Sequence, residues 1–156
     1  MKDNETYKYL NKYKYIIIDI NALKDKIDKL SLLIYNISTA SIIGYEKDRN
    51  IKDVNPDSLL SSKVAKILDL QNEYADKVVE SEKLCKEIRS FIKNNASDEL
   101  GRTILERYFC DNWNMEKISV ESHYSFQYIR RKFYRDIKEI ELKRRENIKK
   151  MYQKSK

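Results

Sequence analysis

Glycine and proline are scarce in this chain of 156 residues, which contains two glycines and one proline. Because sheets of many short strands need frequent turns, this scarcity argues against a β-sandwich or a β-barrel. Cysteine occurs only twice, at Cys85 and Cys110, without a Cys-x-x-Cys spacing. We therefore expect neither a disulfide framework nor a zinc site, and interpret both cysteines as small buried apolar residues rather than as a reactive pair.

Long apolar runs are also missing. The most apolar stretch, residues 15–18, is followed directly by Asp19, whereas a membrane span needs roughly 18 uncharged residues. The N-terminal residues MKDNETYK lack the apolar core of a secretory signal. No phosphate-binding loop, dinucleotide fingerprint, metal triad or pair of catalytic carboxylates is recognisable. We expect a cytoplasmic protein that is not an enzyme and binds no membrane, metal or cofactor.

Charge is plentiful instead. Charged residues make up 37% of the chain, and 32 basic against 25 acidic side chains give a net charge of +7. The excess is concentrated in residues 125–156, which hold 12 basic and 4 acidic side chains. This distribution is compatible with an anionic partner that binds the C-terminal region.

Two long stretches space their apolar residues at alternating steps of three and four, a heptad pattern typical of packed helices. They predict one helix from about Thr6 to Ser38 and a second from about Pro56 to Asn94, joined by a loop at about 39–57. The first seam comprises Tyr9, Tyr13, Ile16, Ile20, Leu23, Ile27, Leu30, Ile34 and Ile37. The second comprises Leu60, Val64, Ile67, Gln71, Tyr74, Val78, Ser81, Cys85, Ile88 and Ile92. We expect a coiled-coil-like antiparallel hairpin, with two helices that dimerise in parallel as the alternative.

Three shorter helices are predicted after the hairpin. One begins at Ser97-Asp98-Glu99 and ends near Cys110-Asp111-Asn112, and a short one covers about Asn114–Glu121. The last starts after the capping residue Ser125 and buries Ile129, Phe133, Ile137 and Ile140. A short helix, a turn at His123 and a longer capped helix form a helix-turn-helix, whose turn residue often needs a positive φ.

The expected fold is therefore all-α. Residues 1–95 form the long N-terminal helical hairpin, for oligomerisation or partner binding. Residues 96–156 form a three-helix DNA-binding domain with a basic tail, which we expect to fold on its own.

The C-terminal motifs resemble a known family. The runs Leu105–Phe109, Trp113–Ile118, Tyr124–Ser125, Tyr128–Ile129 and Ile137–Ile140 are similar to region four of sigma factors. The resemblance is greater to phage-encoded transcriptional regulators of the ArpU and RinA type, and it covers residues 97–142. It implies a sigma region four-like helix-turn-helix that reads bases just after the capping residue and one turn later, here at Phe126, Gln127 and Arg131.

Helix geometry identifies the side chains that would touch DNA. Gln127 and Arg131 suit adenine and guanine edges, and Phe126 suits a thymine methyl group. The remaining candidates position the helix, mainly through phosphates, and they are Ser125, Arg130, Lys132, Tyr134, Arg135 and Lys138.

These features predict a sequence-specific, double-stranded DNA-binding transcription regulator of phage or prophage origin. We expect a homo-oligomer, with a dimer favoured, and RNA polymerase is a candidate second partner. One alternative is a small terminase-like subunit that recognises DNA for packaging. The other is a helical protein-interaction module that does not bind DNA.

Overall fold

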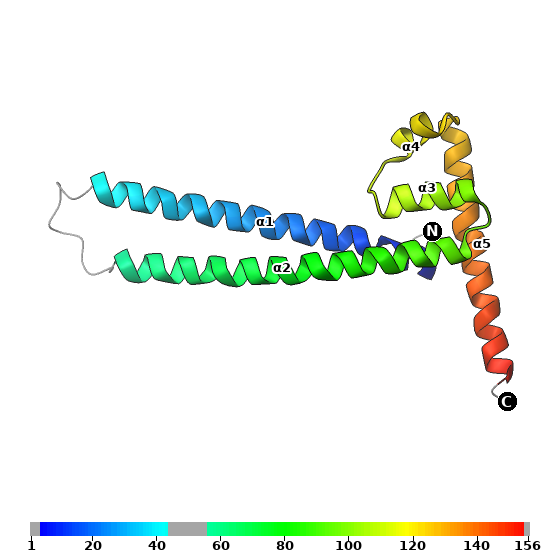
Figure 1. Cartoon of the computed structure of the whole chain (residues 1–156), viewed down its shortest axis with the longest axis horizontal. Coiled ribbons are helices and arrows are strands. Elements are labelled where there is room, and N and C mark those ends of the chain that lie inside the picture. Colours follow the sequence, from blue (N-terminus) through cyan, green and yellow to red (C-terminus); the bar gives the residue numbers. More distant parts are fainter. Residues whose placement is uncertain (1–3, 44–55, 155–156) are drawn as a thin grey trace. The chain divides into compact units, whose positions relative to one another are not determined.

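A computed structural model describes residues 4–43 and 56–154, with side-chain surroundings for residues 4–36 and 60–150. This part of the chain is all-α, as predicted, and contains no strand. Its helices are α1 (Glu5–Ile43), α2 (Pro56–Asn95), α3 (Glu99–Phe109), α4 (Met115–Ser122) and α5 (Phe126–Lys154) (Figure 1).

The helix bounds lie close to the predicted ones, with one clear difference. Helix α1 continues to Ile43, beyond the predicted end at Ser38. No helix-breaking residue precedes Gly44, so nothing in the sequence interrupts the helix earlier. The predicted loop was therefore placed too early at residues 39–43, and its central part, 44–55, lies outside the described residues.

The chain divides into two compact units, but not at the predicted boundary between residues 95 and 96. Unit 1 combines residues 1–16 with residues 81–156, and unit 2 consists of residues 17–80. The start of α1 and the end of α2 therefore belong with the three C-terminal helices. This division follows the shared core, whereas the predicted boundary follows the ends of the helices.

The core of unit 1 explains this division. Its buried cluster comprises Leu10, Ile88, Ile92, Ile104, Leu105, Phe109, Cys110, Ile118, Ile129, Phe133, Ile137 and Ile140. Leu10 comes from α1 and Ile88 and Ile92 come from α2, and all three are fully buried. Phe109 of α3 stacks on Phe133 of α5, with ring centroids 5.6 Å apart. Helices α3 to α5 thus share their core with the ends of the two long helices.

A polar contact also ties the first turn of α1 to α5. Thr6 is fully buried, and its backbone N–H donates to Glu141 Oε2 over 3.1 Å. The Thr6 hydroxyl donates a second hydrogen bond to the same oxygen. Arg145 approaches the other oxygen of Glu141 at 2.9 Å. A carboxylate is favourable at this position because the N-terminus of a helix carries partial positive charge.

In unit 2 the two long helices run antiparallel. Asp19 of α1 lies opposite Lys77 of α2 at 3.9 Å, and further along α1 a pocket is lined by Lys24 and Ile27 together with Gln71 and Tyr74 of α2. As residue numbers rise along α1, the facing numbers fall along α2.

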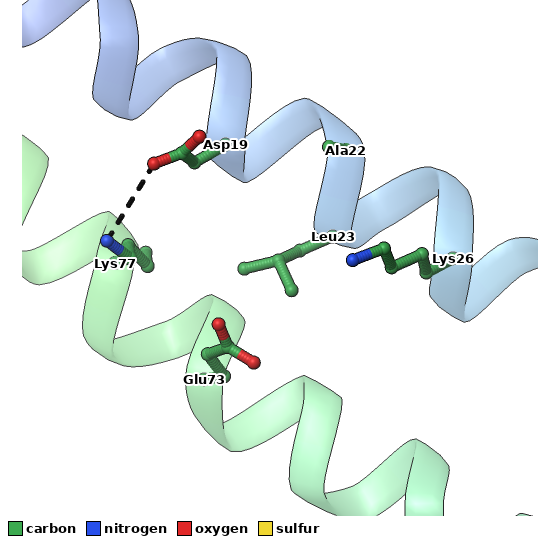
Figure 2. Close-up of a pocket in the computed structure, with 6 residues that line it drawn as sticks. All are labelled: Asp19, Ala22, Leu23, Lys26, Glu73 and Lys77. Atoms are coloured by element: carbon green, nitrogen blue, oxygen red, sulfur yellow. Dashed lines mark ion pairs between the residues drawn. The ribbon is translucent and has the colours of Figure 1, made fainter.

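Charged side chains flank the seam of unit 2. Figure 2 shows a second pocket in which Leu23 points between the helices, with Lys26 on the α1 side and Glu73 and Lys77 on α2. The pair Asp19–Lys77 is exposed, so it contributes at most about 1 kcal/mol. The Asp19–Lys77 pair therefore joins the two helices without supplying much of their stability.

The apolar seam of unit 2 is only partly covered. Among the residues of unit 2 whose side chains are described, Ile20 and Leu23 alone are buried. Val64 is 42% exposed and Gln71 is also exposed, although the heptad pattern placed both on the seam. Two helices alone cannot enclose a wide apolar face.

None of the helices in the described ranges has a stretch both long and apolar enough to cross a membrane.

Candidate nucleic-acid interface

The turn between α4 and α5 is fixed by backbone geometry at His123. Helix α4 begins after Asn114, whose side chain accepts a 2.7 Å hydrogen bond from the Lys117 N–H. It ends at His123, which has φ 57° and ψ 27°. The left-handed conformation expected at this turn is therefore present, and its N–H still bonds the end of α4 at Val120. Ser119 is buried in α4, in keeping with a close helix approach.

Ser125 starts α5 as predicted. Its hydroxyl oxygen accepts from the Tyr128 N–H at 3.3 Å, and its carbonyl accepts from the Ile129 N–H at 3.1 Å. Ile129 and Phe133 are then buried in the core of unit 1. The cap and the buried stripe together fix which side of α5 faces solvent.

Eight of the nine predicted contact residues are exposed. They are Ser125, Phe126, Gln127, Arg130, Arg131, Tyr134, Arg135 and Lys138. Phe126 and Tyr134 are 41% and 40% exposed, so part of each ring faces solvent. Arg130 lies over the Tyr134 ring, 5.9 Å from its centroid.

Lys132 is the exception and corrects the prediction. Its side chain is 3% exposed, and its Nζ lies 2.7 Å from Asp136 Oδ1 and 2.7 Å from Asp98 Oδ2. A buried ammonium group held by the buried carboxylate of Asp136 and the half-exposed carboxylate of Asp98 is not available to a phosphate. Lys132 instead connects the start of α3, which Asp98 caps, to the middle of α5.

The packing around Lys132 leaves no spare room. Gly101 of α3 approaches so closely that an added Cβ would clash with the Asp136 carboxylate and lie 2.9 Å from Lys132 Nζ. Burial tends to lower the pKa of Lys132, but the hydrogen bonds to Asp136 and Asp98 outweigh it and raise the pKa above its usual value. The lysine is therefore charged within this cluster.

The burial of Asp136 leaves the start of α5 without exposed negative charge. Residues 122–138 contain five basic side chains and only one carboxylate, which is Asp136. That carboxylate is 1% exposed and is paired with Lys132. The exposed side chains of this stretch are accordingly neutral or cationic, although Arg135 lies 3.9 Å from Glu139 just beyond it.

Sequence reasoning missed a pair of exposed tyrosines beside this surface. The rings of Tyr124 in the turn and Tyr128 in α5 stack at 5.0 Å with an interplanar angle of 25°. They are 48% and 44% exposed. The spacing of four residues would indicate neighbouring rings if both residues lay in one helix. Tyr124 precedes α5, so the spacing alone does not predict that the two rings stack.

Trp113 lies just before α4, and two cationic side chains make cation–π contacts with its ring. Lys117 Nζ is 4.0 Å from a Trp113 ring centroid, and the Arg107 guanidinium is 4.8 Å away. Trp113 itself packs against the core of unit 1. The partial burial of Trp113 agrees with a role in packing rather than with a role as a stacking platform for a nucleic-acid base.

Over the described ranges, no group of three or more His, Cys, Asp or Glu side chains is arranged to hold a metal ion. No protein-family model matches the chain, and neither a curated protein nor a solved structure matches it.

Proposed function

We propose that the chain is a sequence-specific DNA-binding transcription regulator, of the kind found in phages and prophages, that reads double-stranded DNA with a helix-turn-helix made of α4 and α5. The observation that carries the proposal is the exposed start of α5, where the only carboxylate of residues 122–138 is buried against Lys132. A helix of this kind enters the major groove with its first turns and meets no repulsion from its own side chains.

The candidate base readers share the exposed face. Gln127 and Arg131 are four residues apart on α5, so their side chains project from the same side, and both are exposed. Gln and Arg can make bidentate hydrogen bonds to adenine and guanine, worth about 1–3 kcal/mol of discrimination each. Phe126 is available to a thymine methyl group, and Arg130 and Lys138 to phosphates.

The net charges of the two units also support binding of DNA by unit 1. Unit 1 contains 23 basic and 14 acidic residues, a net charge of +9. Unit 2 contains 9 basic and 11 acidic residues, a net charge of −2. A polyanionic partner would thus be attracted to unit 1 and not to unit 2.

The end of α5 adds to the positive field without reading bases. Residues 142–150 are all exposed and contain five cations against the single acid Glu146. At 1.5 Å per residue, Lys149 lies about 33 Å along the helix from Gln127. If Gln127 enters the major groove, these cations serve long-range attraction rather than specificity.

A second copy is the proposed partner of unit 2. Exposed apolar side chains lie on both of its helices, with Ile18 at 61%, Leu68 at 55% and Val79 at 68% exposure. A dimer would cover them and bring two reading helices to one operator, as specific binding by small readers generally requires. If unit 2 instead bound RNA polymerase, its partner would be a different protein. If it formed a ring of terminase type, the assembly would have a larger mass in solution than a dimer.

Binding to short duplexes tests the proposal. The full chain is titrated onto a random-sequence duplex and onto single-stranded DNA over a range of salt concentrations, and bound duplexes are then selected from a random library. We expect the chain to bind duplex DNA with an association constant whose logarithm falls by about 0.9 per phosphate contact for each unit increase in the logarithm of the salt concentration. We also expect the selection to enrich one sequence motif.

Two variants make this test sharper. Arg131→Ala should lower the salt slope by about one if it also contacts a phosphate, or relax the selected motif if it reads a base. The matched control is Lys63→Ala in unit 2, which should change neither. A chain that binds no duplex would favour the protein-interaction alternative, and a large ring would favour the packaging alternative.

A further inference from the structure

Helix α1 has a second heptad strip, on the side away from the seam that contains the buried Ile20 and Leu23. We call it the outer strip, and it consists of Ile18, Ala22, Asp25, Lys29 and Leu32, at steps of four, three, four and three. All five side chains are exposed, and Ile18 and Leu32 are 61% and 63% exposed. At 3.6 residues per turn, the five positions fall within an arc of about 80° around the helix. A heptad strip of this kind is typical of a helix that packs against a further helix.

The order of residues in the outer strip indicates what that further helix carries. Its two ends are apolar, with Ile18 at one end and Leu32 at the other, and its centre holds the acid Asp25 and the base Lys29. A helix that covers the strip must therefore present a base to Asp25 and an acid to Lys29, between apolar ends. The same strip of a second copy, turned end for end, has this order.

Antiparallel pairing of two outer strips satisfies both the charges and the sizes. When Asp25 of one copy faces Lys29 of the other, the twofold axis repeats the contact, so two opposite-charge pairs lie at the centre. In the same register, the small Ala22 of each copy faces the larger Leu32 of the other. Ile18 then lies one turn beyond this layer.

Parallel pairing in register has the opposite electrostatic result. It would place Asp25 against Asp25 and Lys29 against Lys29, and like charges that face each other across a helix pair are destabilising. The two charged residues therefore favour one orientation of the helices over the other, even though exposed ion pairs supply little affinity themselves.

We propose that the outer strip of α1 is the contact surface between two copies of this chain, which pair antiparallel through it. The inference rests on the pairing of unit 2 in the proposed function, to which it adds the residues in contact and the orientation. It requires no DNA, so it can be tested on the protein by itself.

Sedimentation equilibrium on the full chain measures the dimer dissociation constant. We expect the wild type to dimerise, and Asp25→Lys and Lys29→Asp each to raise the dissociation constant by roughly tenfold or more, because the twofold axis creates the like-charge contact twice. Leu32→Asp should abolish the dimer, since it places a charge against an apolar layer.

Charge exchange shows whether the variants act through the proposed pairing. The double variant Asp25→Lys/Lys29→Asp should dimerise about as tightly as the wild type, because each base again faces an acid. An equimolar mixture of Asp25→Lys and Lys29→Asp should form mixed dimers, which native mass spectrometry distinguishes by mass.

The matched control is Asp76→Lys, which makes the same change of charge at an exposed position of α2. It should leave the dissociation constant unchanged. Far-ultraviolet circular dichroism of each variant establishes that the helices are retained. The double variant provides a second check, because it contains both substitutions and should still form the dimer.

Two results would overturn the inference. One is a wild-type chain that stays monomeric. The other is a dimer whose dissociation constant does not change in folded Asp25→Lys, as expected of a parallel pair or of contact through another surface. DNA binding is scored separately: a monomer that still selects a duplex motif contradicts only this inference, whereas a dimer that binds no duplex contradicts only the DNA-binding proposal.

Discussion

Lys132 Nζ lies 2.7 Å from Asp136 Oδ1, one turn further along α5, and both side chains are almost completely removed from solvent. Asp98 at the start of α3 contacts the same ammonium group. In the sequence, Lys132 belongs to a cluster of basic residues that we assigned to DNA binding. In the structure, it connects the start of α3 to α5 through two ion pairs. This distinction between neighbouring cations leads to the first prediction.

Lys132→Met should destabilise the chain strongly, because it leaves the Asp136 carboxylate buried without its cation. Breaking a buried pair in this way typically costs about 3–5 kcal/mol. Arg131→Met, at the adjacent exposed position, should change the free energy of unfolding by no more than about 0.5 kcal/mol. Urea unfolding of both variants checks this contrast.

The double variant Lys132→Met/Asp136→Leu supplies the control. Removing both charges should recover a substantial part of the loss, since no unpaired buried charge remains. Equal unfolding free energies for Lys132→Met and Arg131→Met would contradict the buried-pair assignment.

Thr6→Val should weaken unit 1 in a pH-dependent way. The hydrogen bond from the Thr6 hydroxyl is the main reason that the pKa of Glu141 is lowered below its ordinary value. A group with a lowered pKa stabilises the fold above its unfolded pKa, and this stabilisation is lost as the pH falls through the folded value.

We therefore expect Thr6→Val to cost about 1.5–3 kcal/mol at neutral pH, the range for a hydrogen bond to a charged group. The difference from wild type should shrink as the pH is lowered through the acidic range, because Glu141 becomes protonated in both proteins. Thr6→Ser retains the hydroxyl and should keep most of the pH dependence. A stability difference between the wild type and Thr6→Val that stays constant with pH would contradict this role of Glu141.

Residues 96–156 alone should fail to fold cooperatively, contrary to the expectation from sequence. The fragment lacks Leu10, Ile88 and Ile92, which are fully buried in the core of the three C-terminal helices. In the full chain, Ile92→Ala should cost about 2–5 kcal/mol. Thermal unfolding of the fragment is measured by circular dichroism. A sharp melting transition like that of the full chain would show that the three helices are sufficient for cooperative folding.

His123→Gly should leave the turn intact and make the chain equally or more stable. His123 has φ 57°, a left-handed conformation that costs a residue with a Cβ about 1–2 kcal/mol. Glycine avoids this cost but adds freedom to the unfolded chain, so we expect a net gain of no more than about 1 kcal/mol. His123→Val should instead be destabilising. Thermal melting ranks the three proteins, and a valine variant that melts above the glycine variant would contradict the assigned conformation.

Local signals predicted much of this fold. The alternation of steps of three and four gave the two long helices, and the capping residues Asn114 and Ser125 marked the starts of α4 and α5 correctly. Each of these features depends on a few neighbouring residues, which is why sequence alone was sufficient. The exposed positions of Gln127 and Arg131 followed from the same periodicity.

Contacts between distant segments were not predictable in the same way. The pairing of Thr6 with Glu141 joins residues 135 positions apart, and no local pattern indicates it. For Lys132 a signal was present, because Lys132 and Asp136 continue the three-four spacing that begins at Ile129. Charged residues at such a spacing are usually solvated, and the ion pairs of Lys132 with Asp136 and Asp98 offset the cost of burying them here.

The most direct test of the proposed reading helix is a competitive binding measurement on the duplex selected by the wild-type chain, against a scrambled duplex of equal length. Gln127→Ala and Arg131→Ala should each reduce the preference for the selected duplex by roughly 5- to 150-fold, corresponding to about 1–3 kcal/mol. Gln127→Ala should barely change the salt dependence, since it removes no charge, and both variants should melt like the wild type. If both variants keep the wild-type preference for the selected duplex, the exposed face of α5 does not read sequence, and the central claim is wrong.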